Sequence, residues 1–182
     1  MILPASIGVA IEVDRVALIL LKSSIKGPKV IDSQVHQLNP EDPMDVNVER
    51  INRFLDEFIN KNKAKGVNVF VGIPRQAAIL RFIDLPVAVK ENLDETVAYE
   101  IEKYIPFSIN DICYDTEIIS ENKKEGTLKI MVVAVKKERV EPYYEIGKAI
   151  DANLVGVDIS PMALLNFLNK TQKINYPSIG IV

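Results

Sequence analysis

The sequence contains very few of the residues that build disulfides, metal sites and nucleophilic catalytic centres. It has one cysteine (Cys113), one histidine (His36) and no tryptophan. A single cysteine cannot form an internal disulfide, and one histidine with one cysteine does not supply the clustered ligands of a zinc site. A Ser-His-Asp or Cys-His arrangement would depend on His36 alone, which lies in a predicted strand beside Gln34 and Gln37. We therefore expect no catalytic residues, no metal and no cofactor.

Charge of one sign and long apolar runs are missing as well. The net charge is −3, so the chain has no strongly basic character suited to nucleic acid or an anionic membrane. No apolar run approaches the ~20 residues needed to cross a bilayer, and the N-terminus lacks the charged region of a signal peptide. The phosphate-binding spacings G-x-x-x-x-G-K-[ST] and G-x-G-x-x-G do not occur. These absences predict a cytoplasmic protein without a nucleic-acid partner and without direct membrane insertion.

The sequence instead contains short apolar strands alternating with amphipathic helices, which is the pattern of an α/β protein. The first part predicts a β-hairpin over 6–24, a strand over 29–38, a helix from Asp42 and Pro43 to about Lys63 that ends before Gly66, and a strand over 67–73. The middle part predicts a strand over 78–85, a helix over 91–105, and two hairpin strands over 113–120 and 128–135. The last part predicts a helix over 138–152, a strand over 154–159, a helix from Ser160 to about Lys170, and a strand beginning at Ser178.

The helix expected over 91–105 has the clearest pattern in the chain. Apolar residues recur at four-residue steps, as on one face of an amphipathic helix: Leu93, Val97, Ile101 and Ile105. Pro106 then ends the helix, because proline lacks a backbone N–H and disfavours helical geometry in the residue before it.

The residues around this helix resemble the type IV pilus assembly protein PilM family. The similar features are Arg81 with Ile83-Asp84-Leu85-Pro86, the run Glu100-Ile-Glu-Lys-Tyr-Ile-Pro-Phe107, and Asp111. The resemblance covers nearly the whole chain. It implies an actin-like (ribonuclease H-like) α/β subdomain with an inserted strand-helix-strand-strand subdomain, as in the division protein FtsA and the secretion protein GspL. The expected boundaries are 1–77 and 137–182 for the two parts of the actin-like subdomain and 78–136 for the insertion.

Proteins of this fold that hydrolyse ATP use small and hydroxyl residues in the first hairpin turn, where backbone N–H groups approach the phosphates. The resemblance places Gly8 at the family's first glycine. However, Ala10 replaces the family's aspartate, Glu12 replaces its second glycine, and Val13 replaces its first hydroxyl residue. A second phosphate loop would follow the strand at 178–182, where the sequence stops. We therefore do not assign a nucleotide site to these residues.

Three functions remain open at this point, the third and weakest being a free-standing interaction domain that kept only the first-half fold. The first is a non-enzymatic scaffold of a type IV pilus or type II secretion inner-membrane platform. The second is an actin-like ATPase of the PilM or FtsA kind whose nucleotide-binding second half is absent from this chain. The run 100–107 favours the pilus protein, whereas the altered phosphate loop is more similar to GspL. The resemblance does not decide between the pilus and the secretion system.

The resemblance further implies a partner, the cytoplasmic N-terminal tail of a PilN-like inner-membrane protein. The resemblance places this tail in a groove between the actin-like subdomain and the insertion, bounded by the strand 78–85 and the helix 91–105. The protein is then expected in the cytoplasm at the inner-membrane face. Candidate contacts are Arg81 and three aromatic residues outside the apolar stripe: Tyr99, Tyr104 and Phe107. The alternative is that these aromatics pack the insertion onto its neighbour. A pilus or secretion ATPase is a further expected partner, and self-association is expected through the strand at 178–182.

Overall fold

The computed structural model describes residues 5–25, 27–148, 150 and 152–171. The strands are β1 (Ala5–Ile11), β2 (Arg15–Lys22), β3 (Lys29–Gln37), β4 (Val67–Ile73), β5 (Ala78–Pro86), β6 (Ile112–Asn122), β7 (Thr127–Lys136) and β8 (Ala152–Ile159). The α-helices are α1 (Met44–Asn62), α2 (Leu93–Glu100), α3 (Lys137–Val140) and α4 (Ser160–Thr171). The 3₁₀ helices are Arg75–Ala77, Val87–Asn92, Ile101–Lys103, Ile109–Asp111 and Glu141–Glu145. The strand predicted at 178–182 lies outside the described residues.

The chain divides into two units. The first comprises the residues up to Arg75 and those from Glu145 onward, and the second runs from Gln76 to Tyr144. The second unit ends eight residues beyond the boundary expected at Lys136. The reason is local packing, because α3 contacts β6 and β7 and Lys137 Nζ donates a hydrogen bond to the carbonyl of Asn110 at 2.6 Å.

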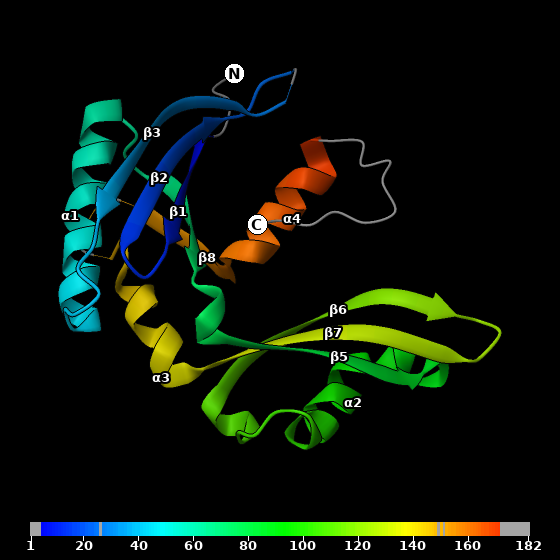
Figure 1. The fold of residues 1–182 in the computed structure, drawn as a ribbon. Coiled ribbons are helices and arrows are strands. Elements are labelled where there is room, and N and C mark those ends of the chain that lie inside the picture. Colours follow the sequence, from blue (N-terminus) through cyan, green and yellow to red (C-terminus); the bar gives the residue numbers. More distant parts are fainter. Residues whose placement is uncertain (1–4, 26, 149, 151, 172–182) are drawn as a thin grey trace. The chain divides into compact units, whose positions relative to one another are not determined.

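The first unit is built on a five-stranded sheet in the order β3-β2-β1-β4-β8 (Figure 1). The first three strands are antiparallel, whereas β4 pairs parallel to both β1 and β8. Alternate residues of each strand face the core on one side, as a period of two requires. On β1 these residues are Ile7, Val9 and Ile11, all of which are buried, as the sequence predicted for this hairpin.

Helix α1 covers the buried face of this sheet with the five apolar residues predicted from its periodicity. These residues are Val48, Ile51, Leu55, Phe58 and Ile59, each at most 5% exposed. The predicted start of this helix was one residue too early, whereas its predicted end at about Lys63 is confirmed. Pro43 rather than Asp42 is the N-cap, and Asp42 instead forms an ion pair with Arg50. The helix stops before Gly66, because Lys63 adopts the left-handed conformation (φ 53°) and caps it.

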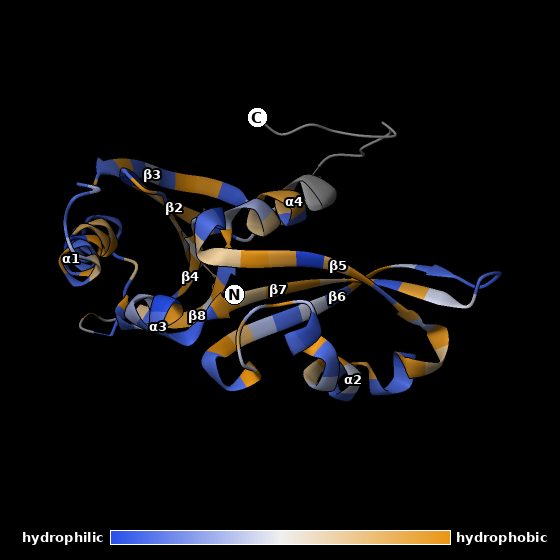
Figure 2. Cartoon of the chain, turned by 60° about the horizontal axis from the view of Figure 1, so that its bottom comes forward, coloured by the Kyte–Doolittle hydropathy of each residue, from blue (hydrophilic) through white to orange (hydrophobic). Residues whose placement is uncertain are grey.

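The second unit contains a three-stranded antiparallel sheet in the order β5-β7-β6. One face of this sheet packs against the α2 segment in a continuous apolar core. Its buried members are Ile83, Leu85, Val97, Ile101, Ile105, Ile112, Leu128, Ile130, Val132 and Ala134. Figure 2 shows the same division by hydropathy, with largely apolar ribbon along β7 and a polar turn where β6 joins it.

Two predicted helices are shorter in the structure. The helix expected over 91–105 is α-helical only over Leu93–Glu100 and continues as a 3₁₀ turn over Ile101–Lys103. Its stripe survives this change, since Val97, Ile101 and Ile105 are all at most 3% exposed. The altered backbone still delivers the apolar side chains to one face.

The helix expected over 138–152 was wrong for most of its length. Only Lys137–Val140 is α-helical, and a 3₁₀ helix follows over Glu141–Glu145. Pro142 cannot donate to the helical ladder, and Gly147 has a φ of 87°, which lies in the left-handed region. Ala152 belongs to β8 and not to a helix. The conformation of this segment is therefore determined by two backbone features, at Pro142 and Gly147, and not by the spacing of its apolar side chains.

Candidate functional site

The β1–β2 turn is the segment in which the resemblance would place a first phosphate loop. It is a tight hairpin in which the Glu12 N–H donates to the Arg15 carbonyl at 2.9 Å. The carbonyl of Asp14 accepts the N–H of Leu38 at 2.8 Å, which ties the turn to the end of β3. The Asp14 and Arg15 side chains form an exposed ion pair with 3.8 Å between Oδ1 and Nε. Backbone hydrogen bonding within the protein thus already uses part of this turn.

The three replaced phosphate-loop residues lie at the surface of this hairpin. Ala10 and Val13 are exposed, the latter at 58%, and Glu12 is half-buried. Ala10 pairs with Gly72 of β4, and a Cβ added to Gly72 would lie 3.9 Å from the Ala10 Cα. Because Asp14 is paired with Arg15, the Glu12 carboxylate leaves the turn with a net negative charge, which opposes a polyphosphate.

Tyr99 is the most exposed of the three predicted aromatic contacts. Its side chain is 83% exposed on α2, and the ammonium of Lys103 lies 6.0 Å from its ring centroid. Lys103 also donates to Glu100 Oε1 at 3.0 Å. This hydrogen bond and the negative charge of Glu100 raise the pKa of Lys103. The face of α2 turned away from the core therefore presents an aromatic ring beside an ion pair.

The other three predicted contacts have different surroundings. Tyr104 is 37% exposed, immediately after the 3₁₀ turn. Phe107 is half-buried and packs against the core of the second unit, with the ammonium of Lys136 4.6 Å from its ring centroid. Arg81 is exposed on β5 and donates from Nη1 to the carbonyl of Leu80 at 3.0 Å. Across the described residues, no hydrogen bond, ion pair or ring contact joins Arg81, Tyr99, Tyr104 and Phe107.

Sequence reasoning missed Phe82, which is 57% exposed on β5. Its neighbour Ile83 faces the core shared with α2, so Phe82 points to the opposite face of the sheet. The ammonium of Lys129 lies 5.9 Å from the Phe82 ring centroid, and Phe82 is paired with Met131 on β7. The available signal was the strand alternation, because two adjacent large apolar residues cannot both face one core.

A hollow of about 400 Å³ lies at the start of α2. It is lined by six consecutive residues, Lys90, Glu91, Asn92, Leu93, Asp94 and Glu95. Three carboxylates in this short run make a solvated acidic surface, and Lys90 is held to one side by an ion pair with Glu121 at 2.5 Å. Within the ranges that the structure covers, no group of three or more histidine, cysteine, aspartate or glutamate residues is arranged to hold a metal ion. No helix in those ranges has the length and apolarity needed to span a membrane.

The strand order β3-β2-β1-β4-β8 and the inserted three-stranded unit define the class of this protein as actin-like α/β. A family described as type IV pilus assembly protein PilM matches residues 8–175, and the chain belongs to this family. Both results confirm what the motif around 81–107 predicted. A comparison with curated proteins finds no match.

Two solved structures illustrate the shared fold. The first is a PilM–PilN type IV pilus biogenesis complex, with a TM-score of 0.75 and 22% identity over 91% of this chain and 50% of the other. The second is the cytoplasmic domain of EpsL from Vibrio cholerae, an inner-membrane component of the type II secretion system. It has a TM-score of 0.53 and 16% identity over 85% of this chain and 57% of the other. The chain thus spans about half the length of these relatives.

Proposed function

We propose that this protein is a non-enzymatic scaffold of a type IV pilus platform that binds the cytoplasmic tail of a PilN-like membrane protein. The observation that carries the proposal is the match to the PilM family over residues 8–175. Similarity to a PilM from a PilM–PilN complex supports the choice of partner. Such a tail would hold the protein at the cytoplasmic face of the inner membrane. A pilus or secretion ATPase is a further partner that a scaffold of this kind would contact.

The non-enzymatic part of the proposal rests on the β1–β2 turn. Ala10 and Val13 provide neither a metal-binding carboxylate nor a hydroxyl, and Glu12 adds a negative charge where a phosphate would sit. The competing function is an ATPase in which residues outside this chain supply the nucleotide site. Binding of nucleotide by this chain, despite these three replacements, would support that alternative.

The second unit provides the surface on which the tail is proposed to bind. Tyr99 and Arg81 are exposed there, and a tyrosine offers a large contact area with a polar tip. The guanidinium of Arg81 can exchange its contact with the Leu80 carbonyl for a carboxylate or carbonyl of the ligand. Phe107 is less suited to contact the tail because it already packs against the core.

The direct test measures binding of a fluorescent peptide with the N-terminal sequence of the PilN protein from the same pilus system. Fluorescence anisotropy of the wild-type chain should give saturable binding. Tyr99→Ala should weaken it roughly thirtyfold, equivalent to about 2 kcal/mol for a contact that dominates the interface. Phe70→Ala is the matched control, because Phe70 is an exposed aromatic residue (48%) of the first unit.

Each outcome has a defined meaning. Binding that Tyr99→Ala weakens and Phe70→Ala does not supports both the partner and the surface. Binding that neither substitution changes places the tail elsewhere on the protein. If the wild-type chain shows no binding although circular dichroism confirms that it is folded, the proposed partner is wrong for this chain.

A further inference from the structure

The two sheets end in four edge strands, which are β3 and β8 in the first unit and β5 and β6 in the second. An edge strand offers unpaired backbone N–H and C=O groups to any other extended chain. Folded proteins commonly block such edges with charged residues, prolines or β-bulges. The four edges therefore differ in how readily they can accept a further strand.

Three of the edges carry such blocking features. Strand β5 has Arg81 in its middle and ends at Pro86. Strand β6 carries Asp115 and Glu117, and its register against β7 shifts after Ile118. Strand β8 has a register shift against β4 that leaves its central residues irregularly paired. None of these strands offers a regular and uncharged edge of five residues.

Strand β3 differs because its second half has none of these features. The run Ser33–Gln37 contains no aspartate, glutamate, lysine, arginine or proline. Its register against β2 is regular, since the single shift in that pair lies earlier, between Leu20 and Leu21. Val35 in the middle of the run is 62% exposed. An apolar β-branched residue thus occupies the centre of an open edge.

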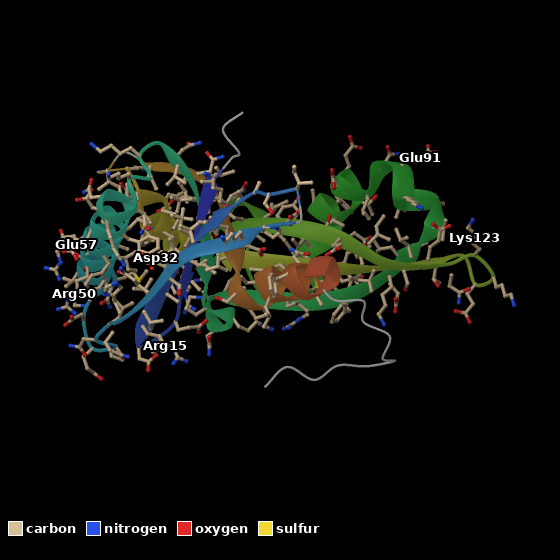
Figure 3. The ribbon with its side chains drawn as sticks, turned by 90° about the horizontal axis from the view of Figure 1, so that it is seen from above. Arg15, Asp32, Arg50, Glu57, Glu91 and Lys123 are labelled. Carbon is tan, nitrogen blue, oxygen red and sulfur yellow. The ribbon has the colours of Figure 1, made fainter. Side chains whose placement is uncertain are left out.

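The charged side chain next to this run is paired within the protein. Asp32, which is labelled in Figure 3, precedes this run, and its Oδ2 is paired with Lys61 Nζ at 2.8 Å. His36 faces α1, where its ring stacks on Phe54 with a centroid distance of 4.1 Å. Another strand that approaches the edge therefore meets no unpaired acidic or basic side chain within the run.

We propose that β3 is a docking edge for a second copy of this chain, which pairs antiparallel with its own β3 about a two-fold axis at Val35. In this register Val35 lies opposite Val35, Gln34 opposite His36, and Ser33 opposite Gln37. No like charges meet, so the edge is complementary to itself. An equivalent pairing of β6 about Thr116 would instead place Asp115 of each copy opposite Glu117 of the other.

The structure also limits the strength of this pairing. Asp32 Oδ1 already accepts the N–H of Ser33 at 2.9 Å, so the free edge begins after that amide. A five-residue strand pair is small compared with the roughly 800 Å² per partner of a stable interface. We therefore expect a reversible dimer that forms as the protein concentration rises.

The register is tested by disulfide cross-linking of Val35→Cys in a Cys113→Ser background. Two cysteines on the two-fold axis lie about 4.5–5.5 Å apart between Cα atoms, which is within the range of a disulfide. Val30→Cys is the matched control, because Val30 is on the same strand and similarly exposed, at 54%. In this register the two copies of residue 30 are ten positions apart, or about 33 Å. Oxidation should yield a covalent dimer of the first variant only.

A second experiment removes the dimer without a cross-link. Sedimentation velocity of the wild-type chain should show a sedimentation coefficient that rises with concentration. Val35→Lys places two positive charges at the axis and should abolish the rise, whereas Val30→Lys should preserve it. If the wild-type chain stays monomeric, the proposal is wrong, and a strand that pairs with β3 would have to come from a different protein. Equal cross-linking of both cysteine variants, or a dimer that survives Val35→Lys, also overturns it.

Discussion

Asn52 and Gly147 are 95 residues apart in the sequence, and the Gly147 N–H donates a hydrogen bond to Asn52 Oδ1 at 2.8 Å. Asn52 Nδ2 also donates to the carbonyl of Glu145 at 3.2 Å. One amide side chain on α1 therefore satisfies a donor and an acceptor of the segment that leads into β8. This double contact fixes the backbone where the predicted helix over 138–152 fails to form.

The first prediction concerns this pair of hydrogen bonds. Asn52→Ala removes both hydrogen bonds, so the Gly147 N–H loses its partner and the Glu145 carbonyl keeps only the Lys148 N–H at 3.3 Å. This loss should lower the free energy of unfolding by about 1–3 kcal/mol. Asn52→Asp retains an acceptor for Gly147 but sets a carboxylate against the Glu145 carbonyl, so we expect it to be destabilised too. Urea denaturation followed by circular dichroism measures both changes. An unfolding free energy of Asn52→Ala equal to that of the wild-type chain would contradict the role of Asn52.

The second prediction concerns the left-handed backbone at Gly147. A Cβ at this position would make only an ordinary contact, 3.5 Å from the Ala152 Cβ, so any cost arises from the φ of 87° and not from crowding. Gly147→Ala should therefore destabilise the protein by about 1–2 kcal/mol. Gly147→Asn should cost less, because asparagine tolerates positive φ better than alanine. Equal stability of the alanine variant and the wild-type chain would show that the segment relaxes.

The third prediction compares two phenylalanines of the first unit. Phe58 on α1 is fully buried, whereas Phe70 on β4 is 48% exposed. Phe58→Ala should lower the free energy of unfolding by about 3–5 kcal/mol through lost burial and a cavity. Phe70→Ala should cost about 1 kcal/mol or less, because roughly half of its surface already contacts water. Urea midpoints of the two variants decide this, and similar midpoints would show that α1 is not the main cover of the sheet.

The periodicity of apolar residues predicted most of the fold. Side chains determine an element when one face of it must be buried, as with the stripe of α1 and the alternation of β1. The pattern failed where single backbone positions decide the outcome. Pro142 and Gly147 interrupt a sequence that still has helical spacing.

The candidate binding residues were less predictable than the fold. Distance from the apolar stripe correctly placed Tyr99 at the surface, because α2 is regular at that point. The same reasoning did not reveal that Phe107 packs on the core, because the chain leaves the helix before it and changes direction. Phe82 was missed because its exposure depends on which face of the β5-β7-β6 sheet α2 covers. The covered face is set by tertiary packing, which the spacing of apolar residues does not show.

The fourth prediction concerns nucleotide binding. Millimolar Mg-ATP should leave the melting temperature of this chain unchanged, because Glu12 repels a polyphosphate and Ala10 provides no carboxylate for the metal ion. A ligand present at 100 times its Kd would add about 2.7 kcal/mol of stability, which thermal unfolding readily detects. Ala10→Asp is the comparison variant that restores the family's carboxylate. A clear shift of the wild-type chain that Ala10→Asp does not enlarge would contradict the non-enzymatic proposal.

The fifth prediction concerns the response of Asp32 to pH. Hydrogen bonds from Lys61 and then Asn62 lower the pKa of this carboxyl in the folded protein. Its stabilising contribution is therefore complete above the pKa of an unfolded aspartate, about 3.9, and disappears as pH falls through the lower folded value. Asp32→Asn should reduce stability at pH 7, and the difference from the wild-type chain should shrink below about pH 4.

Urea midpoints measured from pH 7 to the acid limit of folding test this linkage. Glu57→Gln is the matched control, because Glu57 is an exposed carboxylate of α1 without an ion pair among the residues that the structure describes. Its difference from the wild-type chain should remain small at every pH. If the Asp32→Asn difference stays constant down to the acid limit, the carboxylate does not stabilise the contact between β3 and the end of α1 through its charge. High salt should also reduce the difference at pH 7, because the Asp32–Lys61 pair is open to solvent and its attraction is screened.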